Sequence, residues 1–317
     1  MAGGVHPVGG VDYPRTWAEF HAWFGDDEGC LGFLERLRWP EGFVCPHCDG
    51  SAGWRSARGR FSCGGCGVQT SVTAGTIFHG TRTPLVSWFA AMWYVTNQKN
   101  GVSALGLSRV LGIDYKTAWT WLHKLRRAMV RPDRDLLDGP VEVDETYVGG
   151  PEQGLHGRQT VTKSIVAVAV ERRGARGFGR VRLRQVPDVS AESLVGFVTD
   201  VVAAGSTVRT DAWQGYRPLE RAGFRHERTS IRAGSDPAHV VMPGVHRVSS
   251  LLKRWLLGTH QGSVSSEHLD YYLDEFTFRF NRRASRARGL LFYRLAQQAV
   301  RTDPHPYKDL IGGEPRG

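Results

Sequence analysis

Apolar residues recur along this chain with two different periods, and the change falls near Pro140. Before it, apolar side chains return every three to four residues, which predicts helices over 17–39, 84–98 and 103–129. Beyond it, short apolar or alternating runs predict strands. The pattern therefore divides the chain into a mainly helical part and an α/β part.

The α/β part opens with three predicted strands, VEVDETYVG, KSIVAVAVERR and GRVRLRQV. The second has an unbroken apolar centre, which is typical of a strand buried on both faces. A helix follows, with Ser190 as its cap and Gly205 at its end, and then a short strand, TVRTD. Further helices are expected over 245–257 and 265–282. The order β-β-β-α-β followed by helices indicates an α/β domain of the RNase H type.

The charge and composition of the chain indicate what kind of partner it binds. The 317-residue chain is 41% hydrophobic, enough for a sizeable core, and carries a formal net charge of +10. A strongly basic chain favours an anionic partner such as nucleic acid. The opening MAGGVHPVGG lacks an apolar run of signal-peptide length, and no stretch of about 18 apolar residues predicts a membrane span. We therefore expect a cytoplasmic protein with no membrane partner.

Four of the five cysteines form two C-x-x-C pairs, Cys45 with Cys48 and Cys63 with Cys66. Two thiolate pairs on facing turns supply the four soft ligands that a structural zinc ion needs. Glycines around the second pair suit the tight turn that such a pair requires. The spacing predicts a zinc ribbon, and it argues against a redox pair or a disulfide framework. The fifth cysteine, Cys30, is expected in the core.

The segment SALGLSRVL-GID-YKTAWTWLHKLRRAM has the shape of a helix-turn-helix. Gly112 stands where the tight turn needs it, and Asp114 can cap the second helix. That helix would present its first polar residues to DNA bases and its basic residues to phosphates; an ordinary helical hairpin with a basic face is the alternative. The expected DNA contacts on it are Lys116, Thr117, Thr120, Lys124, Arg126 and Arg127.

Two aspartates stand on predicted strands, Asp144 within VEVDETYVG and Asp211 at the end of TVRTD. A carboxylate on a buried strand is costly unless something pairs with it. Two of them on adjacent strands make a site for hard divalent cations, as two-metal phosphoryl transfer requires. The alternative is that each aspartate only caps the helix that follows its strand.

Together these motifs predict a multi-domain α+β protein. Its expected parts are an N-terminal helical segment (1–40), a zinc ribbon (41–75), a helix-turn-helix (80–130), a linker (131–140), an α/β RNase H-like catalytic domain (141–300) and a loose tail (301–317).

The blocks VEVDETYVGG, VRTDAWQGY, HRVSSLLKRWLLGTHQG and HLDYYLDEFTFRFNRR resemble those of the zinc-ribbon group of DDE-type insertion-sequence transposases. The resemblance runs from about residue 17 to about residue 300. It implies an RNase H-like core, two Mg²⁺ or Mn²⁺ ions, and cut-and-join chemistry at the ends of a mobile element. It also implies that Asp144 and Asp211 are the first two catalytic acids.

The third catalytic position departs from the simplest family pattern, which has Glu or Asn seven residues before a Lys. Lys253 matches that Lys, and His246 stands seven residues before it, on the same helical face. His246 is therefore the third candidate, and imidazole suits Mn²⁺ better than Mg²⁺. A phosphate contact or a core histidine is the alternative role. Glu275 and Asn281 are rivals, and the neighbour of Asp144, Glu145, is weaker because it would point to the opposite strand face.

The leading hypothesis is a transposase that binds element ends and target DNA as a homo-oligomer, hydrolyses a phosphodiester and joins the freed 3′-OH to the target. A DNA-binding regulator without catalysis and an RNase H-like nuclease without joining are the alternatives. Further phosphate contacts are expected from basic residues of the last helices, namely Lys253, Arg254, Arg282 and Arg283, with Arg279 beside them.

Overall fold

The computed structural model describes residues 6–57, 59–150, 152, 160–174, 177–229, 237–262 and 264–312. The chain forms two compact units. The amino-terminal unit combines Met1–Arg131 with Ser285–Gly317, and the sheet unit comprises Pro132–Ala284. Among the described residues, no helix is long and apolar enough to cross a membrane.

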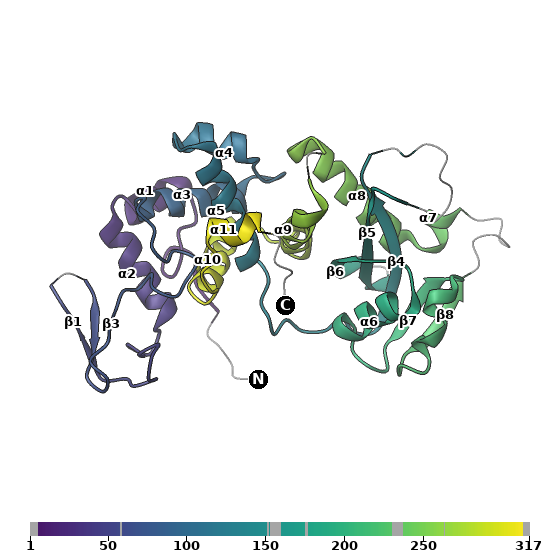
Figure 1. Cartoon of the computed structure of the whole chain (residues 1–317), viewed down its shortest axis with the longest axis horizontal. Helices are drawn as coiled ribbons and strands as arrows, with labels where there is room; N and C mark the ends of the chain where they lie inside the picture. The colour runs from purple at the N-terminus through teal and green to yellow at the C-terminus, as the bar shows by residue number, and fades with distance from the viewer. Residues whose placement is uncertain are drawn as a thin grey trace. The chain divides into compact units, whose positions relative to one another are not determined.

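The amino-terminal unit is built from helices and a small antiparallel sheet in the order β1-β2-β3 (Figure 1). Its elements are α1 (Trp17–Trp23), α2 (Asp27–Arg38), β1 (Gly53–Arg55), β2 (Phe61–Cys63), β3 (Gln69–Thr70), α3 (Leu85–Asn97), α4 (Ala104–Leu111), α5 (Tyr115–Ala128), α10 (Arg288–Ala299) and α11 (Tyr307–Ile311).

An aromatic cluster holds α10 against the first helices of the chain. The ring of Phe292 on α10 is fully buried and lies 5.6 Å from Phe20, 5.7 Å from Phe24 and 5.7 Å from Phe89, centroid to centroid. Contacts at these separations between tilted rings are favourable for aromatic pairs. The expected catalytic domain over 141–300 is therefore too long at its carboxyl end, because α10 completes the core of the other unit.

Two further boundaries differ from expectation. The segment 131–140 is not a free linker, because Leu137 is fully buried and exchanges backbone hydrogen bonds with Val201 and Ala203. The tail from 301 is not loose throughout, because it contains α11, where Leu310 is 3% exposed. Apolar side chains at these positions make both segments parts of packed units.

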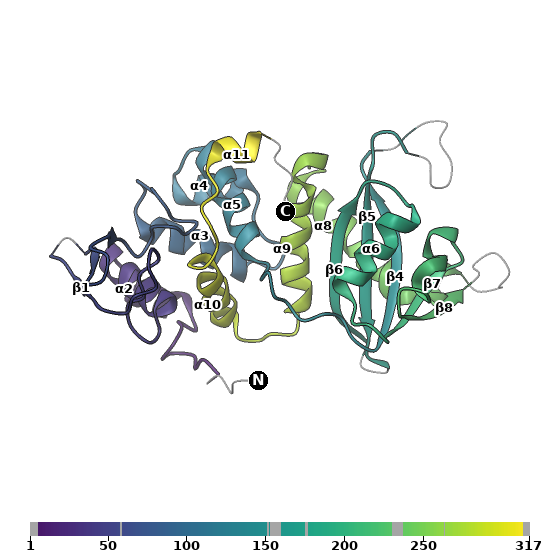
Figure 2. The same cartoon turned by 60° about the horizontal axis from the view of Figure 1, so that its bottom comes forward.

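The sheet unit contains a five-stranded sheet in the order β6-β5-β4-β7-β8 (Figure 2). The first three strands pair antiparallel, and β4-β7 and β7-β8 pair parallel, which is the arrangement of an RNase H-like domain. Its elements are β4 (Pro140–Val148), β5 (Ser164–Arg172), β6 (Phe178–Val186), α6 (Ala191–Val201), β7 (Thr207–Asp211), η2 (Gln214–Leu219), β8 (Arg225–Thr229), α7 (Ala238–Val241), α8 (Pro243–His260), η3 (Ser266–His268) and α9 (Leu269–Asn281).

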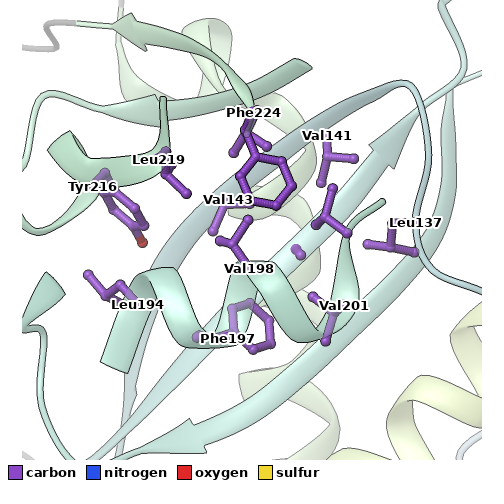
Figure 3. Packing of buried hydrophobic residues seen from close by; sticks show 14 of the residues in the cluster. Leu137, Val141, Val143, Leu194, Phe197, Val198, Val201, Tyr216, Leu219 and Phe224 are labelled. Carbon is purple, nitrogen blue, oxygen red and sulfur yellow. The ribbon is translucent and has the colours of Figure 1, made fainter. Parts of the chain in front are cut away.

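Each face of this sheet has its own hydrophobic core. On one face, side chains of α6 such as Phe197 and Val198 pack with Val143 of β4 and with Tyr216 of η2 (Figure 3). On the other, α8 and α9 pack over the inner residues of β5, among them Val168. The prediction that this strand is buried on both faces is confirmed, since its residues 165–171 are all buried.

The sequence pattern did not predict β8, whose segment RHERT has no apolar alternation. It is an edge strand that pairs only with β7 among the described strands, so it does not need an apolar face. Charged side chains are a usual protection of such an edge.

Candidate functional site

The four ribbon cysteines come together as predicted. Their Sγ atoms all lie within 4.8 Å of one another. The Sγ atoms of Cys45 and Cys66 are 3.7 Å apart, and those of Cys48 and Cys63 are 3.6 Å apart. A tetrahedron with Zn–S bonds of about 2.3 Å has edges of roughly 3.8 Å. The residues therefore fit a closed structural zinc site with no open position for water.

Backbone amides prepare the ribbon for a metal ion. Hydrogen bonds from the backbone of Cys66 and Gly65 lower the pKa of the Cys63 thiol to about 6, so this sulfur is a thiolate at neutral pH. Gly65 N–H donates to that sulfur at 3.3 Å. Since zinc binds thiolates and releases their remaining protons, this sulfur is prepared for the metal.

The helix-turn-helix has the caps that its sequence predicts. Ser103 caps α4, and Gly112 ends it with φ 64°, a left-handed conformation that glycine adopts without strain. Asp114 caps α5 by accepting hydrogen bonds from the N–H groups of Lys116 and Thr117. The second helix of the motif therefore begins where the sequence places it.

The two halves of α5 differ in exposure. Lys116 is exposed, and Thr117 and Thr120 are half-buried, so the first half can reach a ligand. Arg126 is only 2% exposed, so the expectation that it contacts phosphates is wrong for the structure as it stands. Helical spacing does not distinguish a basic residue on the outer face of a helix from one on its buried face.

Other basic side chains of α5 have protein contacts. The Nη1 atom of Arg127 lies 2.9 Å from Nδ1 of His305. The ammonium of Lys124 lies 5.9 Å from the ring centroid of Trp88, and burial lowers its pKa. Near the start of the helix, Lys116 stands over the ring of Tyr307 on α11, at 4.0 Å. The carboxyl-terminal segment thus borders the expected DNA-reading helix.

The register of β4 and β7, continued by two residues, aligns Asp144 with Asp211. The parallel pairing of β4 with β7 sets Glu142 opposite Arg209, and two residues further along the same register come Asp144 and Asp211. Val143 and Val208 point into the core under α6. Because side chains alternate along a strand, both aspartates point to the other face, on which α8 packs. Both aspartates are half-buried.

A buried tyrosine, Tyr216, joins this group of acids from η2. Its hydroxyl donates to Oε2 of Glu145 at 3.1 Å. Burial raises the pKa of Tyr216 well above its ordinary value, and the charges of Glu145, Asp144 and Asp211 raise it further. Three carboxylates thus lie near one neutral phenol. The motif DAWQGY contains this residue, but no feature of the motif distinguishes it as a site residue.

The helix α8 carries the third candidate. Val245 packs on the sheet face that holds the aspartates, and its N–H donates to Glu142 at 3.1 Å. His246 follows it and is half-buried; Lys253 stands two turns later and is exposed. The pKa of Lys253 is lowered by desolvation of its ammonium group and then by nearby Lys163.

The ligand atoms of Asp144, Asp211 and His246 are spaced differently from those of the four ribbon cysteines. Within the described residues, the four cysteines form the one group of three or more potential ligands within 4.8 Å of one another. The ligand atoms of Asp144, Asp211 and His246 are therefore more widely spread.

The rival residues have structural partners. Glu275 is 1% exposed and forms an ion pair with Arg279 at 2.8 Å. Asn281 Oδ1 accepts from Val181 N–H at 2.7 Å, and its Nδ2 donates to Val181 O at 3.2 Å. Glu145 points to the α6 face, as the strand period predicts. Glu275 and Asn281 thus have structural roles within the sheet unit.

Of the basic residues expected to contact phosphates, some have contacts within the protein and others are exposed. Arg283 donates to the backbone carbonyls of Phe178, Gly179 and Phe280, and its guanidinium lies over the Phe280 ring. Arg282 lies over the ring of Phe278, at 4.1 Å. Arg254 on α8 is exposed. Arg283 therefore serves the edge of the sheet, whereas Arg254 is open to a ligand.

Comparison with known proteins identifies the family. Residues 136–281 match the family model described as ISXO2-like transposase domain. Residues 25–69 match the one described as transposase zinc-ribbon domain. Over these two segments the chain is similar to the zinc-ribbon transposases of insertion sequences. The two matches cover the sheet with both aspartates and the ribbon with all four cysteines.

A relative supports this assignment. The chain is 28% identical over 278 residues to a protein described as an uncharacterized protein in transposable element ISH50 of Halobacterium salinarum. The similarity spans 81% of this chain and 91% of that protein.

Proposed function

We propose that this transposase binds the ends of its own mobile element, cuts a phosphodiester there and joins the freed 3′-OH to target DNA. The observation that supports the proposal is the parallel β4–β7 register, which pairs Glu142 with Arg209 and, continued by two residues, aligns Asp144 with Asp211. In a transposase-family chain, such a pair matches what divalent-metal phosphoryl transfer needs.

Asp144, Asp211 and His246 would hold the divalent ions. When bound, such ions make a water or a 3′-OH nucleophilic and stabilise the leaving oxygen. The aspartate carboxylates supply oxygen donors, and the imidazole favours Mn²⁺ over Mg²⁺. Tyr216 stays protonated and holds Glu145 away from the pair through its hydrogen bond.

The DNA is held by other parts of the chain in this proposal. The zinc ribbon and the exposed first half of α5 bind the element end, with Lys116, Thr117 and Thr120 as the reading residues. Lys253 and Arg254 on α8 contact phosphates close to the reacting bond. Because two element ends are processed together, we further propose that the protein acts as a homo-oligomer on DNA.

The test uses duplexes that carry the inverted repeats flanking the coding region. Purified protein with Mn²⁺ or Mg²⁺ is expected to nick these ends and to join them to a plasmid. Nicking without joined product would make the chain a nuclease only, and binding without either reaction would make it a regulator.

A pair of variants examines the third position. His246→Ala is expected to abolish nicking in both metals while end binding persists. His246→Glu restores an oxygen donor and is expected to retain activity with Mg²⁺. If His246→Ala instead weakens binding and leaves single-turnover cleavage at saturating protein unchanged, this histidine contacts DNA and is not a ligand.

A further inference from the structure

The first turn of α8 is capped by a residue from another element. This helix has no side-chain cap of its own at Met242. Instead, the carboxylate of Glu142 on β4 accepts hydrogen bonds from Gly244 N–H at 2.7 Å and from Val245 N–H at 3.1 Å. A carboxylate at this position satisfies two unpaired amides and complements the positive end of the helix dipole.

Glu142 is built into this position. It is fully buried, and its other oxygen accepts from Nη1 of Arg172 at 2.6 Å. A buried carboxylate persists only where charge-assisted hydrogen bonds replace water, and here three donors do so. The helix backbone comes so close that a Cβ at Gly244 would lie 2.7 Å from Oε2 of Glu142 and 3.3 Å from the Phe178 ring.

This contact joins two parts of the candidate metal centre. Glu142 lies two residues before Asp144 on the same face of β4. The amide of Val245 immediately precedes His246 on α8. One carboxylate therefore determines where the helix with the third candidate meets the strand with the first.

We propose that Glu142 is a positioning residue for the strand-transfer centre, and that Gly244 provides the close approach that Glu142 requires. The inference rests on the proposed function, because it presupposes that Asp144 and His246 act together. Glu142 touches neither substrate nor reacting atoms; it acts by holding the start of α8 against β4.

Glu142→Gln is the first variant. A Gln amide has one acceptor oxygen and one donor NH₂, so it must point N–H at either Arg172 or the helix amides, which are donors too. We expect hydrogen exchange in the first turn of α8 to accelerate about tenfold or more. We also expect Mn²⁺ half-saturation, measured both by direct binding and by nicking, to rise about tenfold, with end binding unchanged.

Glu171→Gln is the matched control. Glu171 is likewise buried on the same sheet, and its hydrogen bonds come from Arg180 and Asp138, neither of which lies on α8. It is expected to lower stability without changing α8 exchange or Mn²⁺ dependence. If both variants change Mn²⁺ dependence equally, Glu142 acts through general stability and the inference is wrong.

A second pair of variants leaves the carboxylate in place. Gly244→Ala introduces a Cβ against Glu142, whereas at Gly258 on the same helix an added Cβ meets nothing within 4 Å. Alanine otherwise favours a helix, so Gly258→Ala is expected to retain wild-type exchange and Mn²⁺ dependence. Gly244→Ala is expected to reproduce the effects of Glu142→Gln; wild-type behaviour would overturn the requirement for glycine.

Coupling to the third candidate completes the test. If Glu142 acts by placing His246, then Glu142→Gln combined with His246→Ala binds Mn²⁺ no more weakly than His246→Ala alone. Additive losses would overturn the positioning role. If the wild-type protein neither nicks nor binds Mn²⁺, the proposed function fails and this inference with it. If the wild-type protein nicks DNA and binds Mn²⁺ but Glu142→Gln leaves Mn²⁺ dependence and α8 exchange unchanged, only this inference is wrong and the proposed function stands.

Discussion

Asn281 allows the structural and catalytic roles of the FRFNRR block to be separated. It lies at the end of α9, beside β6, the strand at one edge of the sheet. The outward backbone groups of an edge strand have no strand partner, and Asn281 takes that place by bonding both the N–H and the C=O of Val181. Asp270 does the same for the N–H of Gln185.

The cost of removing this contact follows from which partners remain. In Asn281→Ala, the C=O of Val181 keeps a bond from Nη1 of Arg182 at 3.0 Å, whereas its buried N–H loses the acceptor at 2.7 Å. One orphaned donor and one lost weaker bond cost about 3 kcal/mol. For a unit of this size, that lowers the melting temperature by roughly 6–12 °C.

Thermal unfolding and nicking are measured on the same preparations. Asn281→Asp keeps the acceptor for the Val181 N–H, so its melting temperature is expected to fall less than that of Asn281→Ala. Below their transitions, both variants are expected to nick DNA. An Asn281→Ala protein that melts like the wild type but does not nick would refute this reasoning and return Asn281 to the candidate ligands.

Three other predictions concern the DNA-binding parts. Cys63→Ser removes one of four thiolates, so elemental analysis is expected to find no zinc and gel shifts no end binding; binding without zinc would contradict a structural ion. Buried Arg126→Ala is expected to lower the melting temperature, whereas exposed Lys116→Ala keeps it and changes the preference between cognate and scrambled DNA; matching effects would contradict this division. Arg254→Ala is expected to reduce the slope of log affinity against log salt by about 1, and an unchanged slope would exclude a phosphate contact.

Much of the secondary structure was predictable because it depends on neighbours in sequence. Ser190 and Asp114 cap their helices through amides two or three residues away, and Gly112 ends α4 with its own backbone angle. The ribbon was predictable for the same reason, since the spacing within each cysteine pair specifies a turn.

What the sequence pattern missed depends on distant partners. An apolar stripe on α10 shows that a face is buried, but not that Phe292 returns to Phe20 and Phe24. That return also decides which basic residues of α5 are covered. Asn281 and Arg283 resembled site residues in the sequence. The same types of polar residue bind ligands and form hydrogen bonds to the backbone at a sheet edge, so the residue type alone does not tell the two roles apart.

The candidate site was predicted in its parts but not in its connections. Strand positions placed Asp144 and Asp211 on one sheet, and the structure adds that their strands, β4 and β7, pair parallel. The link from Glu142 to α8 spans about a hundred residues and leaves no local signal. Gly244, which makes that link possible, looks in the sequence like an ordinary helix-start glycine.

The measurement that tests the central claim most directly is strand nicking and joining by Asp144→Asn and Asp211→Asn. Each change removes one carboxylate charge from the site and leaves the ribbon and helix-turn-helix intact. With element-end duplexes and Mn²⁺, both variants are expected to bind as the wild type does but to give neither nicked nor joined product, a loss of at least about a thousandfold in rate. A wild-type rate in both variants would contradict the claim that these two aspartates carry the chemistry of this transposase.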